Sequence, residues 1–333
     1  MRAIVLDRTG KPDVLQISEI ADPIVKDNQV LVRNKYAGVN YADLLARQGL
    51  YSWSPKRPYI LGFEASGIVE EIGKKVTNIE VGDSVIAAAQ TGGYAELNAV
   101  DEKLALGYPD HFNYKEAAAY IATWATAWLA LTEMARVRKG ERLLVQAAAG
   151  GVGTSAIILG KALGLEVYGT ASTQRKRDFI ESLGAHALTY ENFDTELKDK
   201  PPNCVLESVG GDIYKRSNIC LAPLGRIVLI GGSGIHVNKK NPFSLYKAWK
   251  ALPKTNIAKV IKYSKGFMGL HIGRLIPQFD KLKHSLDHLN RLVSENEFRP
   301  IVSEEQIFNL ADAGIAHQYI HDRKNIGKVL LKP

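Results

Sequence analysis

The chain has 333 residues, of which 46% are hydrophobic and 23% charged, which is typical of a globular protein and excludes a mainly disordered chain. The length suggests two domains or one elaborated domain, and two cysteines exclude a disulfide-built scaffold and a four-cysteine zinc lobe. The net charge of +8 arises in one segment, since residues 213–279 contain 12 basic and no acidic residues. This acid-free segment points to a distinct surface rather than to a generally basic protein.

The first part of the chain is predicted to consist of short strands separated by Gly, Pro and Asp turns, at 2–6, 28–39, 66–73, 83–89 and 94–100. This pattern predicts a β-rich domain or an irregular barrel. The N-terminal residues do not have the pattern of a signal peptide, and the longest apolar run, 117–131, is shorter than a membrane-spanning helix. We therefore expect a buried helix at this run and a cytoplasmic protein.

From about residue 118 the pattern changes to alternating strands and helices. Strands are predicted at 142–146, 166–170, 186–189, 203–207 and 226–230, and helices at 153–163 and 176–183. Alternation at this spacing predicts an α/β fold with a doubly wound parallel sheet. An amphipathic helix at 277–296, a helix at 306–318 and a strand at 327–331 are predicted to return to the first domain.

A glycine turn follows the first predicted parallel strand, with the sequence AAAGGVG at 147–153. Compared with the pattern G-x-G-x-x-G, Gly150 and Gly153 hold the second and third places, and Ala148 holds the first. Gly150 would let the backbone approach a pyrophosphate, and Gly153 would let the helix pack tightly on the strand. Because the turn lies between a strand and a helix, it predicts dinucleotide binding, whereas the turn alone would fit any strand–helix connection.

The end of the second parallel strand distinguishes NAD from NADP. Residues 169–177 read GTASTQRKR, with no acidic residue to bind ribose hydroxyls and with three bases after a Ser–Thr pair. A 2′-phosphate prefers such surroundings because it accepts charge-assisted hydrogen bonds. We therefore predict NADP(H); the alternative is that residues 175–177 are merely solvated bases on a surface helix.

The combined motifs resemble the medium-chain dehydrogenase/reductase superfamily and, within it, the zinc-free quinone oxidoreductases of the zeta-crystallin-like group. The motifs are NYAD at 40–43, ARQGLY at 46–51, LGFEASG at 61–67 and the turn at 147–153. Segments that are also similar to the vesicle amine transport protein homologues are GTASTQRK at 169–176, the insert around 241–250, GLHIG at 269–273 and RKNIGKVLL at 323–331. The resemblance implies a GroES-like catalytic domain at 1–118, completed by 276–333, and a Rossmann-type NADP-binding domain at 119–275.

The same resemblance implies the residues that contact the cofactor. They are Thr126 on the nicotinamide side; Ala149, Gly150, Gly151 and Val152 in the pyrophosphate turn; Ser172, Lys176 and Tyr190 in the 2′-phosphate pocket; Ser208, Gly231 and Gly232 at the ends of later strands; and Arg323 and Asn325 in the tail.

Zinc-dependent members of the superfamily have a cysteine at the place of Asn40 and a histidine at the place of Phe63, so we expect no catalytic zinc. Asn40 and Tyr51 match positions that line the active cleft, and they are the candidate hydrogen-bond donors to the acceptor oxygen. Their alternative roles are a turn-stabilising amide and a packed aromatic ring. Asp43 is predicted to fix the loop, and Leu45 replaces an aromatic residue of some quinone reductases.

Two histidine pairs have the i, i+4 spacing that can bind a metal, His284 with His288 and His317 with His321. Neither has an acid–histidine pattern, and we expect all four histidines to be solvated. The basic insert, 239–265, mixes lysines with aromatic and aliphatic residues. Packing at a domain or subunit interface is the favoured interpretation, contact with an anionic membrane surface comes second, and nucleic-acid binding comes last.

The sequence thus predicts a zinc-free, NADPH-dependent oxidoreductase that transfers hydride to a quinone or an α,β-unsaturated carbonyl. One alternative is a non-catalytic NADP-binding protein that associates with membranes or partners through the basic insert. Another is an enoyl-thioester reductase, which would share the fold and the cofactor. The resemblance further implies a homodimer that pairs through 267–273.

Overall fold

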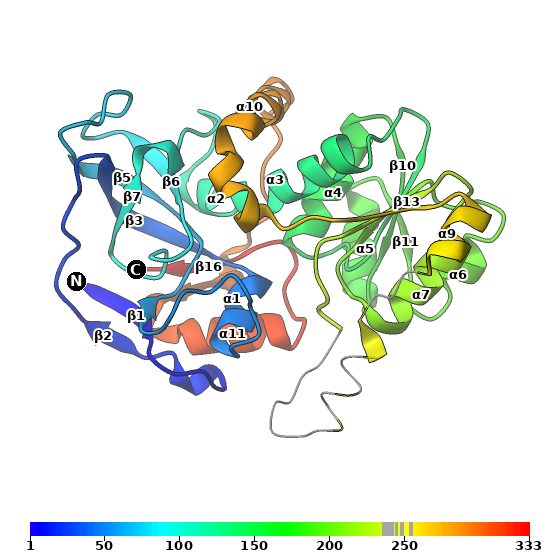
Figure 1. Ribbon diagram of the computed structural model, residues 1–333, viewed down its shortest axis with the longest axis horizontal. Coiled ribbons are helices and arrows are strands. Elements are labelled where there is room, and N and C mark those ends of the chain that lie inside the picture. The colour runs from blue at the N-terminus through cyan, green and yellow to red at the C-terminus, as the bar shows by residue number, and fades with distance from the viewer. Residues whose placement is uncertain (235–242, 244–245, 247–249, 253–255) are drawn as a thin grey trace. The chain divides into compact units, whose positions relative to one another are not determined.

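The computed structural model describes residues 1–234, 243, 246, 250–252 and 256–333, so the predicted basic insert lies largely outside the described residues. The chain divides into two compact units. Unit 1 comprises Met1–Ala125 and Gly273–Pro333, and unit 2 comprises Thr126–Ile272 (Figure 1). The domain limits expected from the sequence, after residues 118 and 275, remain a proposal.

Unit 2 contains a six-stranded parallel sheet in the order β11-β10-β9-β12-β13-β14. With β9 as the first strand, this is the order 3-2-1-4-5-6 of a Rossmann-type sheet, which confirms the predicted fold class. The four central strands, β9, β10, β12 and β13, are mostly buried because helices follow them in a doubly wound arrangement. The bounds of the sheet's strands are β9 Arg142–Val145, β10 Glu166–Thr170, β11 His186–Leu188, β12 Cys204–Glu207, β13 Arg226–Leu229 and β14 Gly266–Gly269.

The helices of unit 2 begin where the sequence supplies turn and capping residues. Thr173, for example, caps the helix after β10, and its hydroxyl accepts a hydrogen bond from the backbone N–H of Lys176. The bounds are α4 Gly151–Ala162, α5 Gln174–Ser182, α6 Phe193–Glu196, α7 Gly211–Cys220 and α9 Ile257–Tyr263. Helix α3, Ile121–Leu129, starts in unit 1 and ends in unit 2.

Unit 1 contains a seven-stranded sheet in the order β15-β16-β3-β5-β6-β8, with β7 paired to β3. The last strands of the chain complete a sheet begun near its start, since β16 pairs antiparallel with the end of β3. A second, three-stranded sheet has the order β2-β1-β4. The bounds are β1 Arg2–Leu6, β2 Ile17–Glu19, β3 Gln29–Val39, β4 Tyr59–Ile60, β5 Glu64–Ile72, β6 Ser84–Ala88, β7 Leu97–Asp101, β8 Ala105–Leu106, β15 Ile307–Asn309 and β16 Val329–Lys332.

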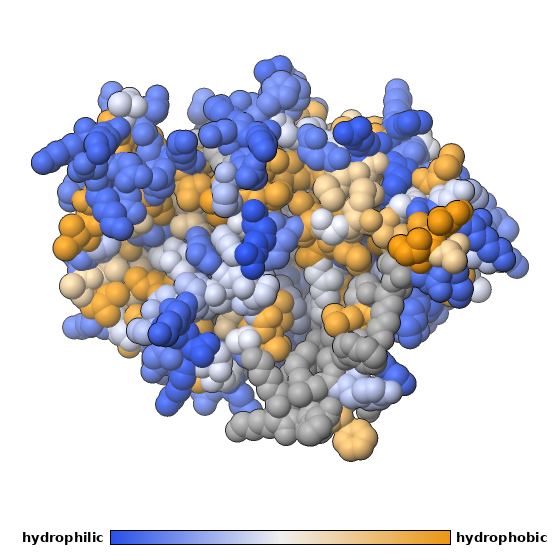
Figure 2. Space-filling view, in the orientation of Figure 1, coloured by the Kyte–Doolittle hydropathy of each residue, from blue (hydrophilic) through white to orange (hydrophobic). Residues whose placement is uncertain are grey.

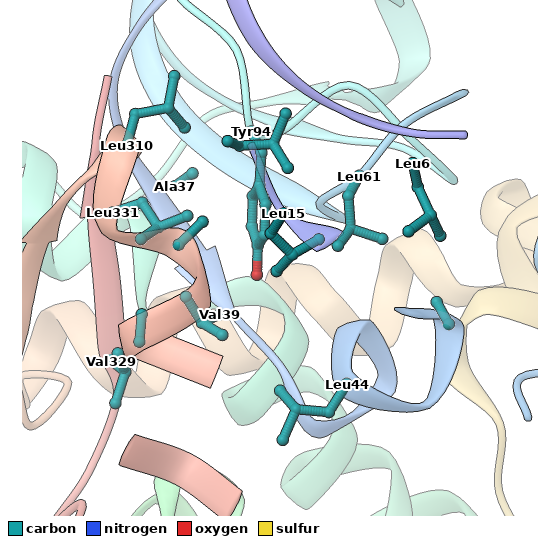
Figure 3. Packing of buried hydrophobic residues seen from close by; sticks show 14 of the residues in the cluster. Leu6, Leu15, Ala37, Val39, Leu44, Leu61, Tyr94, Leu310, Val329 and Leu331 are labelled. Carbon is teal, nitrogen blue, oxygen red and sulfur yellow. The ribbon is translucent and has the colours of Figure 1, made fainter. Parts of the chain in front are cut away.

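The core of unit 1 lies where the two sheets meet the helices α1, Tyr41–Arg47, and α11, Ala313–His321. Figure 3 shows how side chains from both ends of the chain interdigitate there, with Leu6, Leu44 and Leu61 opposite Leu310 and Leu331. All are almost completely buried, so this cluster supplies much of the hydrophobic stabilisation of unit 1. The remaining helices of unit 1 are α2 Tyr114–Ala118 and α10 Phe279–Glu295.

Two elements differ from the sequence-based expectation. The helix expected at 306–318 begins instead with β15, and α11 starts only at Ala313. The apolar run 117–131 forms the end of α2, then α3, and then a π-helical turn over Ala130–Met134. Among the described residues, no helix combines the length and the apolar character needed to cross a membrane.

Candidate functional site

The strand order in unit 2 reverses between β9 and β12, which lie side by side. In open α/β sheets, ligands bind outside the carboxyl ends of the strands at such a reversal. The predicted pyrophosphate turn follows the end of β9, and Gly150 is the N-cap residue of α4. The run Ala149–Val152 therefore stands at a helix N-terminus, where backbone N–H groups and the helix dipole favour an anion.

The two glycines of this turn have different surroundings. A Cβ built on Gly153 would lie 2.5 Å from the carbonyl oxygen of Ala148, closer than real Cβ atoms come. A Cβ built on Gly150 would meet only the carbonyl oxygen of Ala147, at 3.4 Å. Gly153 is therefore needed by the protein's own packing, whereas the space at Gly150 is open for a ligand. The preceding Ala147 has a left-handed backbone conformation, with φ of 54°.

Buried polar side chains are linked by hydrogen bonds next to the pyrophosphate turn, beginning at the ends of β9 and β10. The Thr170 hydroxyl at the end of β10 donates to Oε1 of Gln146 at 2.6 Å, and Nε2 of Gln146 donates to the Ser217 hydroxyl at 2.9 Å. That hydroxyl donates in turn to Glu207 at 3.3 Å. Burial raises the pKa of Glu207, although its Oε1 accepts hydrogen bonds from the backbone N–H groups of Val209 and Gly210. Sequence reasoning missed this chain of hydrogen bonds; its only local signal is the polar residue at the ends of three strands, Gln146 after β9, Thr170 in β10 and Glu207 in β12.

The end of β10 has the character expected of an NADP site. Ser172 is exposed, the Lys176 side chain is half-buried in the first turn of α5, and no acidic residue occurs over 171–177. Arg177 is held by hydrogen bonds from its guanidinium to the carbonyl of Ala171, at 3.4 Å, and to Gln174, at 2.8 Å. Tyr190 follows the neighbouring strand β11 and is half-buried. Cationic groups and a hydroxyl thus gather after β10.

The remaining predicted contacts of unit 2 lie at strand ends and on α3. A Cβ built on Gly231, after β13, would lie 3.5 Å from the carbonyl oxygen of Ser208, after β12, so the structure brings these two residues together. Gly232 follows directly in the same turn. Thr126 is almost completely buried on α3. Its assignment to the cofactor stays a prediction.

In unit 1, Asn40 is the N-cap residue of α1. Its backbone N–H donates to Oδ2 of Asp43 at 2.7 Å, which confirms that Asp43 fixes this loop. Asp43 is completely buried, and burial raises its pKa to about 7. Burial and the nearby Asp43 charge raise the pKa of Tyr51 to about 12. Tyr51 therefore keeps its phenol proton at neutral pH.

The side chain of Asn40 belongs to a buried ionic cluster that the sequence did not suggest. Its Nδ2 donates to Oε1 of Glu64 at 2.9 Å, and its Oδ1 accepts from Nζ of Lys328 at 2.6 Å. Lys328 also donates to Oε1 of Glu64, and the second oxygen of Glu64 accepts from the backbone N–H of Ala122 at 2.9 Å, at the start of α3. The side chains of Glu64 and Lys328 are 1% and 4% exposed. The cluster thus joins the starts of α1 and α3 to the residue that directly precedes β16.

Half-buried aromatic rings lie next to these polar groups in the chain. Trp53 and Phe63 are stacked, with ring centroids 5.8 Å apart, and Tyr51 contacts Phe63 edge-on at 5.4 Å. Gly273 lies directly against Trp53, since a Cβ there would come within 2.4 Å of the indole ring. Tyr51, Trp53 and Phe63 thus form an aromatic group in which only Trp53 and Phe63 are stacked and Tyr51 stands edge-on to both.

The predicted tail residues lie near the start of α1. Arg323 is exposed, and its charge acts on Tyr41, whose pKa is nevertheless raised by burial. Nδ2 of Asn325 donates to the carbonyl of Gly327 at 3.0 Å. The buried Gln306 holds the tail by exchanging two hydrogen bonds with the backbone of Ile326, at 2.7 and 2.9 Å. Sequence reasoning missed Gln306, because its role depends on a pairing between distant segments.

The histidine pairs differ from each other. His284 and His288 are exposed on α10, as expected. His317 is completely buried, so the expectation that it is solvated was wrong. Its Nε2 lies 3.2 Å from the hydroxyl of Tyr94, and burial lowers the pKa of His317 well below its usual value. Among the described residues, no three His, Cys, Asp or Glu side chains form a group that could hold a metal ion.

Comparisons with known proteins agree with this geometry. Residues 26–126 match the family model of the alcohol dehydrogenase GroES-like domain, and residues 151–265 match that of zinc-binding dehydrogenases. The synaptic vesicle membrane protein VAT-1 homolog-like of Mus musculus is 32% identical over 99% of this chain and 81% of its own length. A quinone oxidoreductase of Pseudomonas aeruginosa is 31% identical over 97% of both chains.

Among solved structures, the quinone oxidoreductase of Escherichia coli in complex with NADPH superposes on the whole chain with a TM-score of 0.89 and 29% identity, and it is covered completely. The Rossmann-type sheet, the GroES-like unit and these relatives all indicate the same superfamily. The chain belongs to the medium-chain dehydrogenase/reductase superfamily, in its quinone oxidoreductase-like group near the VAT-1 homologues.

Proposed function

We propose that the chain is an NADPH-dependent oxidoreductase that reduces quinones or α,β-unsaturated carbonyls without zinc. The observation that carries the proposal is the acid-free, cationic end of β10 beside the open turn at Gly150. The quinone oxidoreductase of Escherichia coli, whose structure contains NADPH, supports the same cofactor. The quinone oxidoreductase of Pseudomonas aeruginosa supports the class of acceptor.

The described residues fit the cofactor. The backbone N–H groups of 149–152 would hold the pyrophosphate, and Ser172, Lys176 and Tyr190 would hold the 2′-phosphate. Ser208, Gly231, Gly232 and Thr126 would follow the rest of the dinucleotide, with Arg323 and Asn325 from the tail. When bound, NADPH supplies the hydride. The chain itself has to bind the cofactor and the acceptor, orient them and exclude water.

The acceptor side is proposed to lie in unit 1. Reduction of a quinone or an enone places negative charge on the acceptor oxygen, which a hydrogen-bond donor stabilises. Tyr51 fits this role because its phenol stays protonated at neutral pH. The stacked rings of Trp53 and Phe63 offer a flat apolar surface, which suits a planar acceptor.

Zinc does not fit the donor set. Phe63 offers no ligand atom, and the Asn40 amide already makes hydrogen bonds with Glu64 and Lys328. The ammonium group of Lys328 donates to the oxygens of both residues, and its positive charge would repel a metal ion there. The proposed reduction therefore proceeds without a metal ion.

The cofactor assignment is tested by titrating NADPH and NADH against the protein and following fluorescence. Lys176→Glu should weaken NADPH binding at least tenfold and NADH binding little, because only NADPH carries the 2′-phosphate. Lys198→Glu, at an exposed lysine of the same unit, is the matched control and should leave both affinities unchanged. Tighter binding of NADH by the unaltered protein would sink the NADP assignment.

The acceptor is tested by following NADPH oxidation with a panel of quinones, enones and enoyl thioesters. Turnover with quinones or enones supports the proposal. Preference for enoyl thioesters would instead identify an enoyl-thioester reductase with the same cofactor.

One observation favours a second candidate, a non-catalytic NADP-binding protein that contacts a membrane. On α9, Ile257 and Ile261 are 68% and 73% exposed, and Lys259 and Lys262 lie beside them. Figure 2 shows apolar surface at the place of α9, with hydrophilic residues around it. Apolar side chains among lysines suit an anionic lipid surface. The name of the Mus musculus relative describes a synaptic vesicle membrane protein.

This candidate is tested by sedimentation with vesicles that contain phosphatidylserine. Binding that the double change of Lys259 and Lys262 to Glu abolishes, together with no turnover on any acceptor, would favour it over the reductase. Turnover without vesicle binding would reject it.

A homodimer is part of the proposal as well. β14 is an edge strand of the unit 2 sheet, with backbone groups on one side that β13 does not use. Pairing of two copies along 267–273 would cover this edge. Light scattering should then give a mass twice the 36.6 kDa of one chain, and a monomer at all concentrations would contradict the pairing.

A further inference from the structure

Asn40, Glu64 and Lys328 form a buried cluster in which an ion pair is hydrogen-bonded to a side-chain amide. Lysine is rarely buried unless it is paired, and here a completely buried ammonium meets a completely buried carboxylate. Such a pair is weak evidence of stability, because desolvation opposes the attraction between the charges. Its geometry around Asn40 gives it a more specific role.

The hydrogen bonds determine which partner the oxygen and the nitrogen of the Asn40 side-chain amide each face. An ammonium group can only donate, so the amide oxygen faces Lys328; an ionised carboxylate can only accept, so the amide nitrogen faces Glu64. The backbone of the same residue is held by the Asp43 carboxylate at 2.7 Å. One amide hydrogen is committed to Glu64, and the other lies near the carbonyl of Gly38, at the limit of 3.5 Å.

We propose that Lys328 is a positioning residue of the reductase: by binding Oδ1 of Asn40 while pairing with Glu64, it holds the Asn40 amide in one orientation. In this orientation the second N–H makes only the long hydrogen bond to the Gly38 carbonyl, which an acceptor oxygen can replace. The inference rests on the proposed function. It gives the ionic cluster a catalytic purpose and makes Lys328, which directly precedes β16 near the end of the chain, a part of the site.

The matched variants separate positioning from stability. Lys328→Met leaves Glu64 buried without its cation, so it should lower both the urea midpoint and kcat. Adding Glu64→Gln removes the unpaired charge and should restore the urea midpoint, since two neutral groups then face each other. The ammonium donor to Asn40 is still missing in the double variant, so its kcat should remain at least roughly tenfold below that of the unaltered protein, with the NADPH dissociation constant changed less than about threefold.

Lys332→Met, at an exposed lysine at the end of β16, the strand that directly follows Lys328, is the control and should match the unaltered protein in both measurements. Recovery of kcat together with the urea midpoint in the double variant would overturn the proposal, because the cluster would then be purely structural.

A second measurement does not depend on turnover. In ¹⁵N–¹H spectra, the side-chain amide of Asn40, assigned from its disappearance in Asn40→Ala, should give signals that are protected from hydrogen exchange in the unaltered protein. Lys328→Met and the double variant should shift these signals and remove their protection, because the amide is then no longer held. Unchanged signals would overturn the proposed positioning. If the unaltered protein reduces no acceptor, the reductase proposal fails, while the spectra still decide whether Lys328 orients Asn40.

Discussion

At the residue scale, the two glycines of the pyrophosphate turn should behave differently when they are changed to alanine. Gly153→Ala forces a methyl group against the Ala148 carbonyl and should lower the free energy of unfolding by about 1–3 kcal/mol. Gly150→Ala meets no close protein atom and should cost less than about 1 kcal/mol, yet weaken NADPH binding at least tenfold. Urea denaturation and NADPH titration measure both effects, and a Gly150→Ala protein that binds NADPH normally would contradict the assigned turn.

Asp43 gives the stability a defined pH dependence. Its pKa is about 7 in the folded protein, above its value in an unfolded chain, so the folded state keeps a proton that the unfolded state releases between about pH 4 and pH 7. The free energy of unfolding should therefore fall as the pH rises through this range, by at most about 1.4 kcal/mol for each pH unit from this residue.

Asp43→Asn should remove that contribution while an amide oxygen still accepts from the Asn40 backbone. The comparison uses urea denaturation at several pH values, with Asp199→Asn at an exposed carboxylate as the control. A variant whose pH dependence equals that of the unaltered protein would show that Asp43 does not titrate in this range.

At the scale of elements, the start of α5 should couple helix stability to cofactor binding. Thr173 caps this helix immediately before Lys176, through a hydrogen bond of its hydroxyl. Thr173→Ala should lower the free energy of unfolding by about 1 kcal/mol and raise the NADPH dissociation constant a few-fold, because the first turn frays. Thr173→Ser keeps the hydroxyl and should restore both values in denaturation and fluorescence titrations. Equal NADPH affinities of the unaltered protein and both variants would show that the helix cap does not affect cofactor binding.

The elements that the sequence predicted best are those of the parallel sheet. The strand at 166–170 agrees residue for residue with β10. β15 was missed because its conformation depends on parallel pairing with β16, and no local periodicity shows such a partner. The same reason explains the site: the turn at 147–153 is contiguous and could be predicted, whereas Lys328 and Glu64 come together across 264 residues.

At the scale of the whole molecule, NADPH should stabilise the chain by mass action. At one hundred times the dissociation constant, a ligand that binds only the folded state adds about 2.7 kcal/mol to the free energy of unfolding. The melting temperature should therefore rise by several degrees with NADPH and less with NADH at the same concentration. In the Lys176→Glu variant, NADPH and NADH should raise the melting temperature by the same amount. Equal shifts by both cofactors in the unaltered protein would argue against a 2′-phosphate pocket.

The pairing of β16 with β3 also sets an order of events during synthesis. Unit 2 is continuous from Thr126 to Ile272 and can fold as it leaves the ribosome, whereas β3 waits for a neighbour that is translated after all of unit 2. Until then, β3 presents an unpaired edge to other nascent chains. Long-range closure of this kind is slow, so unit 1 should be the late-folding part and the one most dependent on chaperones.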